Sequence, residues 1–163
     1  MKKSVKETLA SVLRRFKIEN ISLSTDAAGI EISYTNYDAE AAWQMYVELL
    51  TRVTTQILPE DSGDETTALS SVHNIFPVTR EILKLYGRNA LSFSKIAIVI
   101  LNQKIRPFTA KWHKLSLENC FDDKKLCAQF RDELEELRKI ITNYAHLLAD
   151  MAKVEDLTCL IDE

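Results

Sequence analysis

Residues 102–113 hold the densest set of side chains in this sequence that could do chemistry. The candidates for contact with a ligand are Asn102, Lys104, Arg106, Lys111, Trp112 and His113. Basic side chains can hold a phosphate, an indole can stack on a base or ring, and an imidazole can donate a hydrogen bond or act as an acid or base. The same pattern has a structural interpretation, in which Phe108 and Trp112 are core anchors four residues apart and the cations reach outward into water. The sequence supports both a binding site and core packing.

Arg106 and His113 are separated by six residues. This spacing resembles the motif of HEPN domains, in which four to six residues separate an arginine from a histidine; these helical proteins include metal-independent ribonucleases. In that family the two side chains lie in a dimer cleft and act on the RNA backbone. The resemblance therefore implies a homodimer in which Arg106 and His113 are the catalytic pair. The sequence departs from the family pattern at Pro107, where a polar residue usually follows the arginine.

Three longer stretches, residues 46–56, 68–71 and 101–113, are similar to segments of uncharacterised bacterial helical proteins. That resemblance implies a bacterial origin and assigns no activity. Arg52 lies in the first stretch, and its side chain could face the 102–113 segment or a solvated helix surface. We include Arg52 among the candidate binding residues.

The charges of the chain are unevenly distributed, although the net charge is only −3. Residues 80–114 contain eight basic residues, Arg80 among them, and a single acid, Glu81. Residues 18–66 contain ten acids and one base, Arg52. Such polarity suits an anionic partner, with Arg80 as a further binding residue. The alternative is that the two regions neutralise each other within the fold.

Several function classes lack their motifs. The three glycines are isolated, which excludes a dinucleotide fingerprint and a P-loop, and no metal-binding or serine-nucleophile motif occurs. We therefore expect no cofactor and no metal, and we lean against an enzyme. His73 and His146 follow or precede apolar residues and are expected to be hydrogen-bonded core histidines. Three unpaired cysteines, no secretory signal and no apolar run of about 20 residues predict a cytoplasmic protein without a membrane span.

Hydrophobic periodicity predicts most of the secondary structure. Helices are expected over residues 3–16, 36–57, 65–86, 92–105, 108–115 and 126–151. Alternation over 18–24 and 29–34, on either side of a turn-like segment, predicts a β-hairpin. Asn36 is the expected N-cap of its helix, whose buried seam includes Trp43 and Ile57. Pro77 should kink or restart a helix, Gly87 should cap its end, and Pro107 should stop the next helix.

These elements predict a mainly α fold, a helical bundle of four to five helices with an N-terminal helix and a small β-hairpin. We expect a single domain over residues 1–163, with helix and hairpin in 1–35, the bundle in 36–154 and an acidic tail in 155–163.

The leading functional hypothesis is a non-enzymatic protein-interaction module, such as a bacterial antitoxin, immunity or defence-system accessory protein. Its partner would be another protein, bound through the polarised surface or the edge of the hairpin. The alternative is a HEPN-like RNA-binding or RNA-cleaving domain that uses Arg106 and His113. A third hypothesis is a sensor of a phosphate-bearing ligand that uses residues 80–113.

Overall fold

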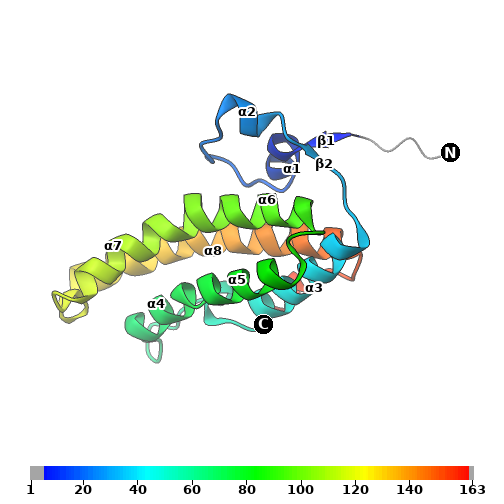
Figure 1. Cartoon of the computed structure of the whole chain (residues 1–163). Coiled ribbons are helices and arrows are strands. Elements are labelled where there is room, and N and C mark those ends of the chain that lie inside the picture. The colour runs from blue at the N-terminus through cyan, green and yellow to red at the C-terminus, as the bar shows by residue number, and fades with distance from the viewer. Residues whose placement is uncertain (1–5, 162–163) are drawn as a thin grey trace.

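The computed structural model describes residues 6–161, apart from the side chain of Val53. The architecture is mainly helical with a small two-stranded antiparallel sheet, which confirms the predicted fold class. Its principal helices are α3 (Asn36–Leu50), α4 (Glu65–His73), α5 (Ile75–Tyr86), α6 (Leu91–Ile100), α7 (Arg106–Ser116) and α8 (Lys124–Ala152). They pack side by side as a bundle, in which α3 lies mainly against α8 and α5 (Figure 1). Among residues 6–161, none of the helices combines the length and apolar character needed to cross a membrane.

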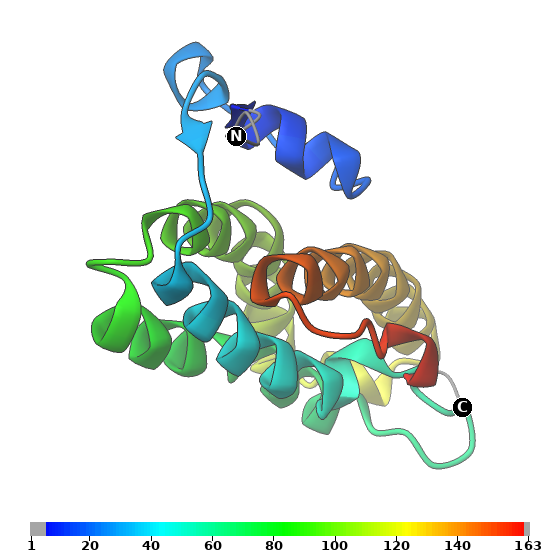
Figure 2. The ribbon, with the colours of Figure 1, turned by 90° about the vertical axis from the view of Figure 1, so that its right-hand side faces the viewer.

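A small N-terminal unit lies against α6 (Figure 2). It contains β1 (Glu7–Thr8), α1 (Leu9–Arg15), α2 (Thr25–Ala28) and β2 (Glu31–Ile32). The strands pair antiparallel, with Glu7 opposite Ile32 and Thr8 opposite Glu31. The predicted hairpin is therefore wrong in its first strand and in its turn. Lys17 and Asn20 adopt positive φ angles of 56° and 61°, which end extended pairing, and the Ser24 side chain caps α2 where a turn was expected.

The N-terminal helix begins later than predicted. Residues 3–5 of that prediction lie outside the described residues, and residues 7–8 form β1. Thr8 and Ser11 make a reciprocal capping box, which fixes the first turn of α1 at Leu9.

Helix α3 is shorter than predicted, and its buried face shares Tyr46 with the predicted seam but not Trp43 or Ile57. Thr35, rather than Asn36, is its N-cap, and the helix ends at Leu50 instead of residue 57. Its buried face consists of Ala41, Ala42, Met45, Tyr46 and Leu49. Trp43 and Ile57 were placed in the seam by the periodicity, and both are exposed. The apolar residues of this helix cover a wide stripe, so the sequence allows more than one choice of buried face. The packing against α5 and α8 buries Ala42, Met45 and Leu49, each one position before a residue of the predicted seam.

Prolines sit where helices begin or change geometry. The break between α4 and α5 falls at Asn74, and Pro77 lies in the first turn of α5, where a missing N–H costs no hydrogen bond. Gly87 is the C-cap residue of α5, as predicted. A side chain would not fit at this position, because a Cβ would lie 2.5 Å from the Leu83 carbonyl oxygen. Pro107 does not stop the helical path that precedes it, contrary to prediction, but it does lie in the first turn of the helix that follows, α7. A π-turn, η2 (Leu101–Ile105), joins α6 to α7 without interruption.

Helix α8 confirms its predicted seam and provides the central wall of the core. Its buried positions include Phe130, Leu134, Leu137, Ile141, Tyr144, Leu148 and Met151. Beyond α8, the segment up to Ile161 packs back onto the bundle through the short helix η4 (Thr158–Leu160). The described part of the predicted acidic tail is therefore a docked segment, because Thr158 and Ile161 are buried.

Candidate functional site

The principal candidate site is a groove between the α4–α5 segment and the η2–α7 segment, here called the α5–α7 groove. It has a volume of about 570 Å³. Its lining residues are His73, Phe76, Arg80, Leu101, Asn102, Arg106, Thr109, Ala110 and His113. Four of the eight predicted binding residues thus come together here: Arg80, Asn102, Arg106 and His113.

Arg106 is held in a defined position within this groove. Its Nε donates a 3.0 Å hydrogen bond to Asn102 Oδ1, and its guanidinium carbon lies 5.0 Å from the centre of the Phe76 ring. The first contact joins Asn102, within the π-turn, to the first residue of α7, and the second is a cation–π contact across the groove. The rest of the guanidinium, beyond Nε, is available to a ligand, because the side chain is exposed.

Arg106 and His113 lie about two turns apart on one helix, which places both on the same face and in the same groove. On the opposite wall, His73 and Arg80 have the same separation in reverse order. Because the α4–α5 and α6–α7 segments run antiparallel (Figure 1), the arginines lie toward one end of the groove and the histidines toward the other.

The groove is electropositive. No carboxylate lines it, and among residues 6–161 neither Arg80 nor Arg106 takes part in an ion pair. His73 is exposed, and its ring centre lies 5.8 Å from that of Phe76, so the prediction of a core histidine is wrong. Sequence reasoning missed His73 as a site residue, although its seven-residue separation from Arg80 mirrors that of Arg106 and His113. The groove can therefore offer guanidinium and imidazole donors to an anion.

The other four predicted binding residues have structural roles. Trp112 is completely buried against Phe121 and Phe130, so it cannot stack on a ligand. Lys111 pairs with Glu133, and Lys104 donates a 2.7 Å hydrogen bond to the Asn20 carbonyl oxygen. Burial lowers the pKa of Lys104.

Arg52 pairs with Glu48 at the end of α3 and does not line the groove. Lys111 is neutralised locally by α8, but among residues 6–161 no ion pair joins residues 80–114 to residues 18–66, so the two regions do not neutralise each other through direct ion pairs.

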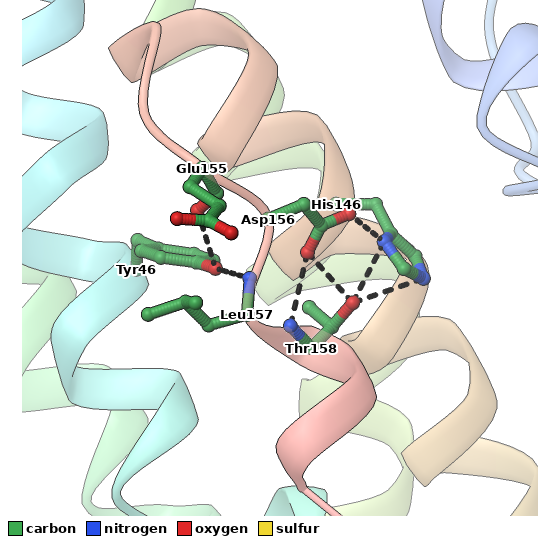
Figure 3. A network of polar contacts seen from close by, with 6 residues as sticks. All are labelled: Tyr46, His146, Glu155, Asp156, Leu157 and Thr158. Atoms are coloured by element: carbon green, nitrogen blue, oxygen red, sulfur yellow. Dashed lines mark hydrogen bonds and ion pairs between the residues drawn. The ribbon is translucent and has the colours of Figure 1, made fainter.

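A second polar cluster joins α8 to the docked C-terminal segment (Figure 3). The Asp156 carboxylate lies 2.5 Å from His146 Nδ1, and the Thr158 hydroxyl lies 2.9 Å from the same nitrogen. The side-chain types suggest a nucleophile, a base and an orienting acid. In such a set, however, the base uses one ring nitrogen for the acid and the other for the nucleophile. Here Nδ1 is the nitrogen nearest to both partners, since the Thr158 hydroxyl lies 2.9 Å from Nδ1 and 3.5 Å from Nε2. The buried Thr158 hydroxyl donates to Asp156 Oδ1 at 2.7 Å.

The cluster is therefore a clasp, and Tyr46 extends it. The Leu157 backbone N–H donates a 2.6 Å hydrogen bond to the Tyr46 hydroxyl oxygen (Figure 3). Burial opposes ionisation of Asp156, but hydrogen bonds with His146 and Thr158 outweigh it and lower the pKa of this carboxyl. The prediction that the His146 ring has hydrogen-bond partners is confirmed. The prediction that His146 lies in the core is wrong, because its side chain is only half-buried.

Within residues 6–161, no three histidine, cysteine or acidic side chains come together in a way that could hold a metal ion. Comparison of the chain with protein-family models, with curated proteins and with solved structures finds no match.

Proposed function

We propose that this chain is an interaction module that captures an anionic group of a partner in the α5–α7 groove. The observation that carries the proposal is the composition of the groove, which is lined by two arginines and two histidines and by no carboxylate. Since neither arginine is neutralised by an ion pair among residues 6–161, the groove attracts negative charge.

Phosphate suits this groove better than a single carboxylate does. Two guanidinium groups toward one end can donate to several phosphate oxygens at once, and the imidazoles toward the other end add donors of the same kind. Phe76 and Asn102 already hold Arg106 in place, so less side-chain entropy is lost when a ligand binds.

We infer that the anionic group belongs to a phosphorylated segment of another protein. A groove of about 570 Å³ has room for one phosphorylated side chain and its neighbours. The apolar side chains of Leu101 and Ala110 lie beside the cations and can contact the aliphatic parts of a peptide. An antitoxin, immunity or defence-system accessory protein would need binding of this kind, and we keep that role as part of the proposal.

A second candidate is the HEPN-like action on RNA, favoured by one observation. Arg106 and His113 face the same groove, as a phosphate-binding arginine and a proton-transferring histidine would have to. This alternative requires a homodimer that brings two such pairs together. The buried Trp112 removes the stacking platform that single-stranded RNA often uses, which is why we rank RNA second.

A binding measurement separates the candidates. Fluorescence anisotropy would be recorded with a labelled phosphoserine peptide, its unphosphorylated counterpart and a labelled single-stranded RNA. We expect phosphate-dependent peptide binding that weakens by about tenfold or more in Arg80→Ala/Arg106→Ala, because two charge-assisted contacts are lost. Lys114→Ala is the matched control, since it removes an exposed charge of α7 outside the groove.

Equal binding by wild type and the double variant would overturn the proposal, as would the absence of any phosphate dependence. Cleavage of the RNA by a dimer, lost in His113→Ala, would replace it with the ribonuclease alternative.

A further inference from the structure

The bundle leaves a tryptophan exposed on its surface. Trp43 is 45% exposed, and Val47, one turn further along α3, is 39% exposed. The buried face of α3 is formed by other residues, and among residues 6–161 the one aromatic ring near Trp43 is that of Tyr46, at 6.2 Å between centres. Exposed tryptophan contributes little to the stability of its own fold, and it is the residue type most enriched among the anchors of protein interfaces.

Trp43 forms one wall of a second groove, here called the α3–α5 groove. Helix α3 contributes Trp43, Gln44, Val47 and Glu48, and helix α5 contributes Pro77, Val78, Glu81 and Ile82. The volume is about 500 Å³, and the lining is mainly apolar. The two helices lie side by side in the bundle (Figures 1 and 2), and the groove lies between them.

The apolar floor has an acidic rim. Glu48 and Glu81 line the groove from its two walls, and Glu40 is exposed one turn before Trp43. Arg52 pairs with Glu48, and Lys84 pairs with Glu81 in a fully surface-exposed contact. Among residues 6–161, Glu40 has no ion pair, so the rim as a whole keeps a negative charge.

This charge selects among the occupants. The three glutamates and their two paired cations leave a net charge of −1, and a second copy of the chain would bring the same net negative charge to this groove, which is unfavourable. A cationic partner gains attraction instead. Parallel walls of two helices around an apolar floor accept an amphipathic helix, whose anchors recur on one face.

We propose that the α3–α5 groove docks a short basic amphipathic helix of another protein. A bulky apolar residue of that helix packs on Trp43 and Val47, and flanking lysines or arginines face Glu40, Glu48 and Glu81. Because Arg80 and the rest of the α5–α7 groove lie on a different face of α5, this proposal stands independently of the phosphate-binding function.

The test uses three synthetic peptides of equal length. One has leucines at helical spacing and lysines elsewhere, the second replaces the lysines with glutamates, and the third scrambles the first so that its apolar face is lost. Trp112 is buried, so a change in tryptophan emission reports mainly on Trp43. We expect the leucine–lysine peptide alone to bind and to shift the emission of the protein to shorter wavelength.

Labelled-peptide anisotropy would then identify the surface. Trp43→Ala should weaken binding by at least about tenfold, as loss of an interface anchor does. Glu40→Gln/Glu81→Gln should weaken binding several-fold and reduce its salt dependence. Leu117→Ala removes a similarly exposed apolar side chain outside the groove and should leave binding unchanged.

Equal binding of the glutamate or scrambled peptide would overturn the proposal, as would full affinity in Trp43→Ala. A concentration-dependent shift of Trp43 emission without peptide would assign the groove to a second copy instead. Arg80→Ala/Arg106→Ala should bind the leucine–lysine peptide normally, so the two proposals can fail separately.

Discussion

The indole N–H of Trp112 donates a 3.0 Å hydrogen bond to Oε2 of Glu133. Lys111 and Gln129 occupy the other oxygen of the same carboxylate. Trp112 is wholly buried, so its single polar atom needs a partner, and α8 provides that partner from the edge of the core. The contact explains why a tryptophan, a lysine and a histidine in succession do not form one site: Trp112 faces the core, Lys111 faces α8, and His113 faces the groove.

Glu133→Gln should destabilise the fold by about 1–2 kcal/mol at neutral pH, since it replaces charge-assisted hydrogen bonds with neutral ones. Burial raises the pKa of Glu133. Hydrogen bonds from Lys111, Gln129 and Trp112 lower the pKa by more than burial raises it, so the pKa of Glu133 lies below its ordinary value. The stabilisation is therefore fully present above the unfolded-state pKa of about 4.3 and is lost as the pH falls through the folded-state pKa.

Urea unfolding of wild type and Glu133→Gln at several pH values checks this. The difference in the free energy of unfolding should be constant near pH 7, should begin to shrink as the pH falls below the unfolded-state pKa of about 4.3, and should vanish only below the lowered folded-state pKa. Asp132→Asn, a neighbouring exposed position, is the control. A difference that persists unchanged at low pH would contradict the assignment.

Long helices could be predicted from the sequence, whereas short strands that pair with a distant segment could not. The apolar residues of α8 repeat at helical spacing over many turns, so the assignment of the helix does not depend on any single residue. Strands β1 and β2 are two residues long and more than 20 positions apart, and no periodicity of two can be recognised in so short a segment. Their pairing depends on contacts such as the 2.7 Å hydrogen bond from the Leu9 N–H to the Ile30 carbonyl oxygen, which only the tertiary fold creates.

The candidate site was predictable only in part. The sequence paired Arg106 with His113 only through the HEPN-like spacing, because a helix stop was expected at Pro107; the continuous helix α7 places both side chains in one groove. It left open whether Trp112 belongs to a site or to the core, because that depends on which face of α7 packs against α8. His73 was not predicted as a site residue, because the neighbouring Val72 suggested an apolar environment. In the structure α4 ends at His73, and the His73 side chain lies on the surface.

Asp38→Ala should destabilise the protein by about 2–4 kcal/mol, because it leaves the buried Phe93 N–H and two partly buried Thr35 donors without their acceptor. The Asp38 carboxylate is fully buried and accepts hydrogen bonds from the Thr35 N–H, the Thr35 hydroxyl and the Phe93 N–H, each at 2.8 Å. It therefore caps its own helix and the first turn of α6, whose N-cap Ala90 has no side-chain acceptor. Chemical denaturation gives the measurement, and Asp26→Ala in the exposed first turn of α2 should cost far less. Comparable losses in both variants would contradict the bridging role.

The clasp of Figure 3 should open when Asp156 is protonated. Hydrogen bonds with His146 and Thr158 outweigh burial and lower the pKa of Asp156, so the clasp is intact above the unfolded-state value and is lost as the pH falls through the folded-state value. The protection factors of the amides of residues 155–161, which are exchange rates corrected for the pH dependence of an unstructured amide, should therefore fall at low pH, and in Thr158→Val already at neutral pH, while the centre of α8 stays protected. Cys159→Ser, at an exposed neighbour, should exchange as wild type does. Unchanged protection in Thr158→Val would show that apolar contacts alone hold the segment.

The π-turn at Leu101–Ile105 acts as one extra residue in an otherwise α-helical path. The Arg106 N–H bonds to the Leu101 carbonyl five residues back, and Pro107, which has no N–H, follows immediately. Deletion of Gln103 should convert the turn to α-helix and keep the register on both sides. It would also place Pro107 in the interior of a regular α-helix, at a cost of about 3 kcal/mol.

Adding Pro107→Ala to the deletion should recover most of that stability, whereas Pro107→Ala alone should change it little. The deletion also shortens the separation of Asn102 and Arg106 from four residues to three, which breaks the hydrogen bond that orients the guanidinium. The doubly altered protein should therefore regain its unfolding midpoint but bind the phosphoserine peptide more weakly than wild type. Denaturation and anisotropy on the same four proteins measure both effects. Recovery of stability together with wild-type binding would show that the π-turn serves the helix and not the groove.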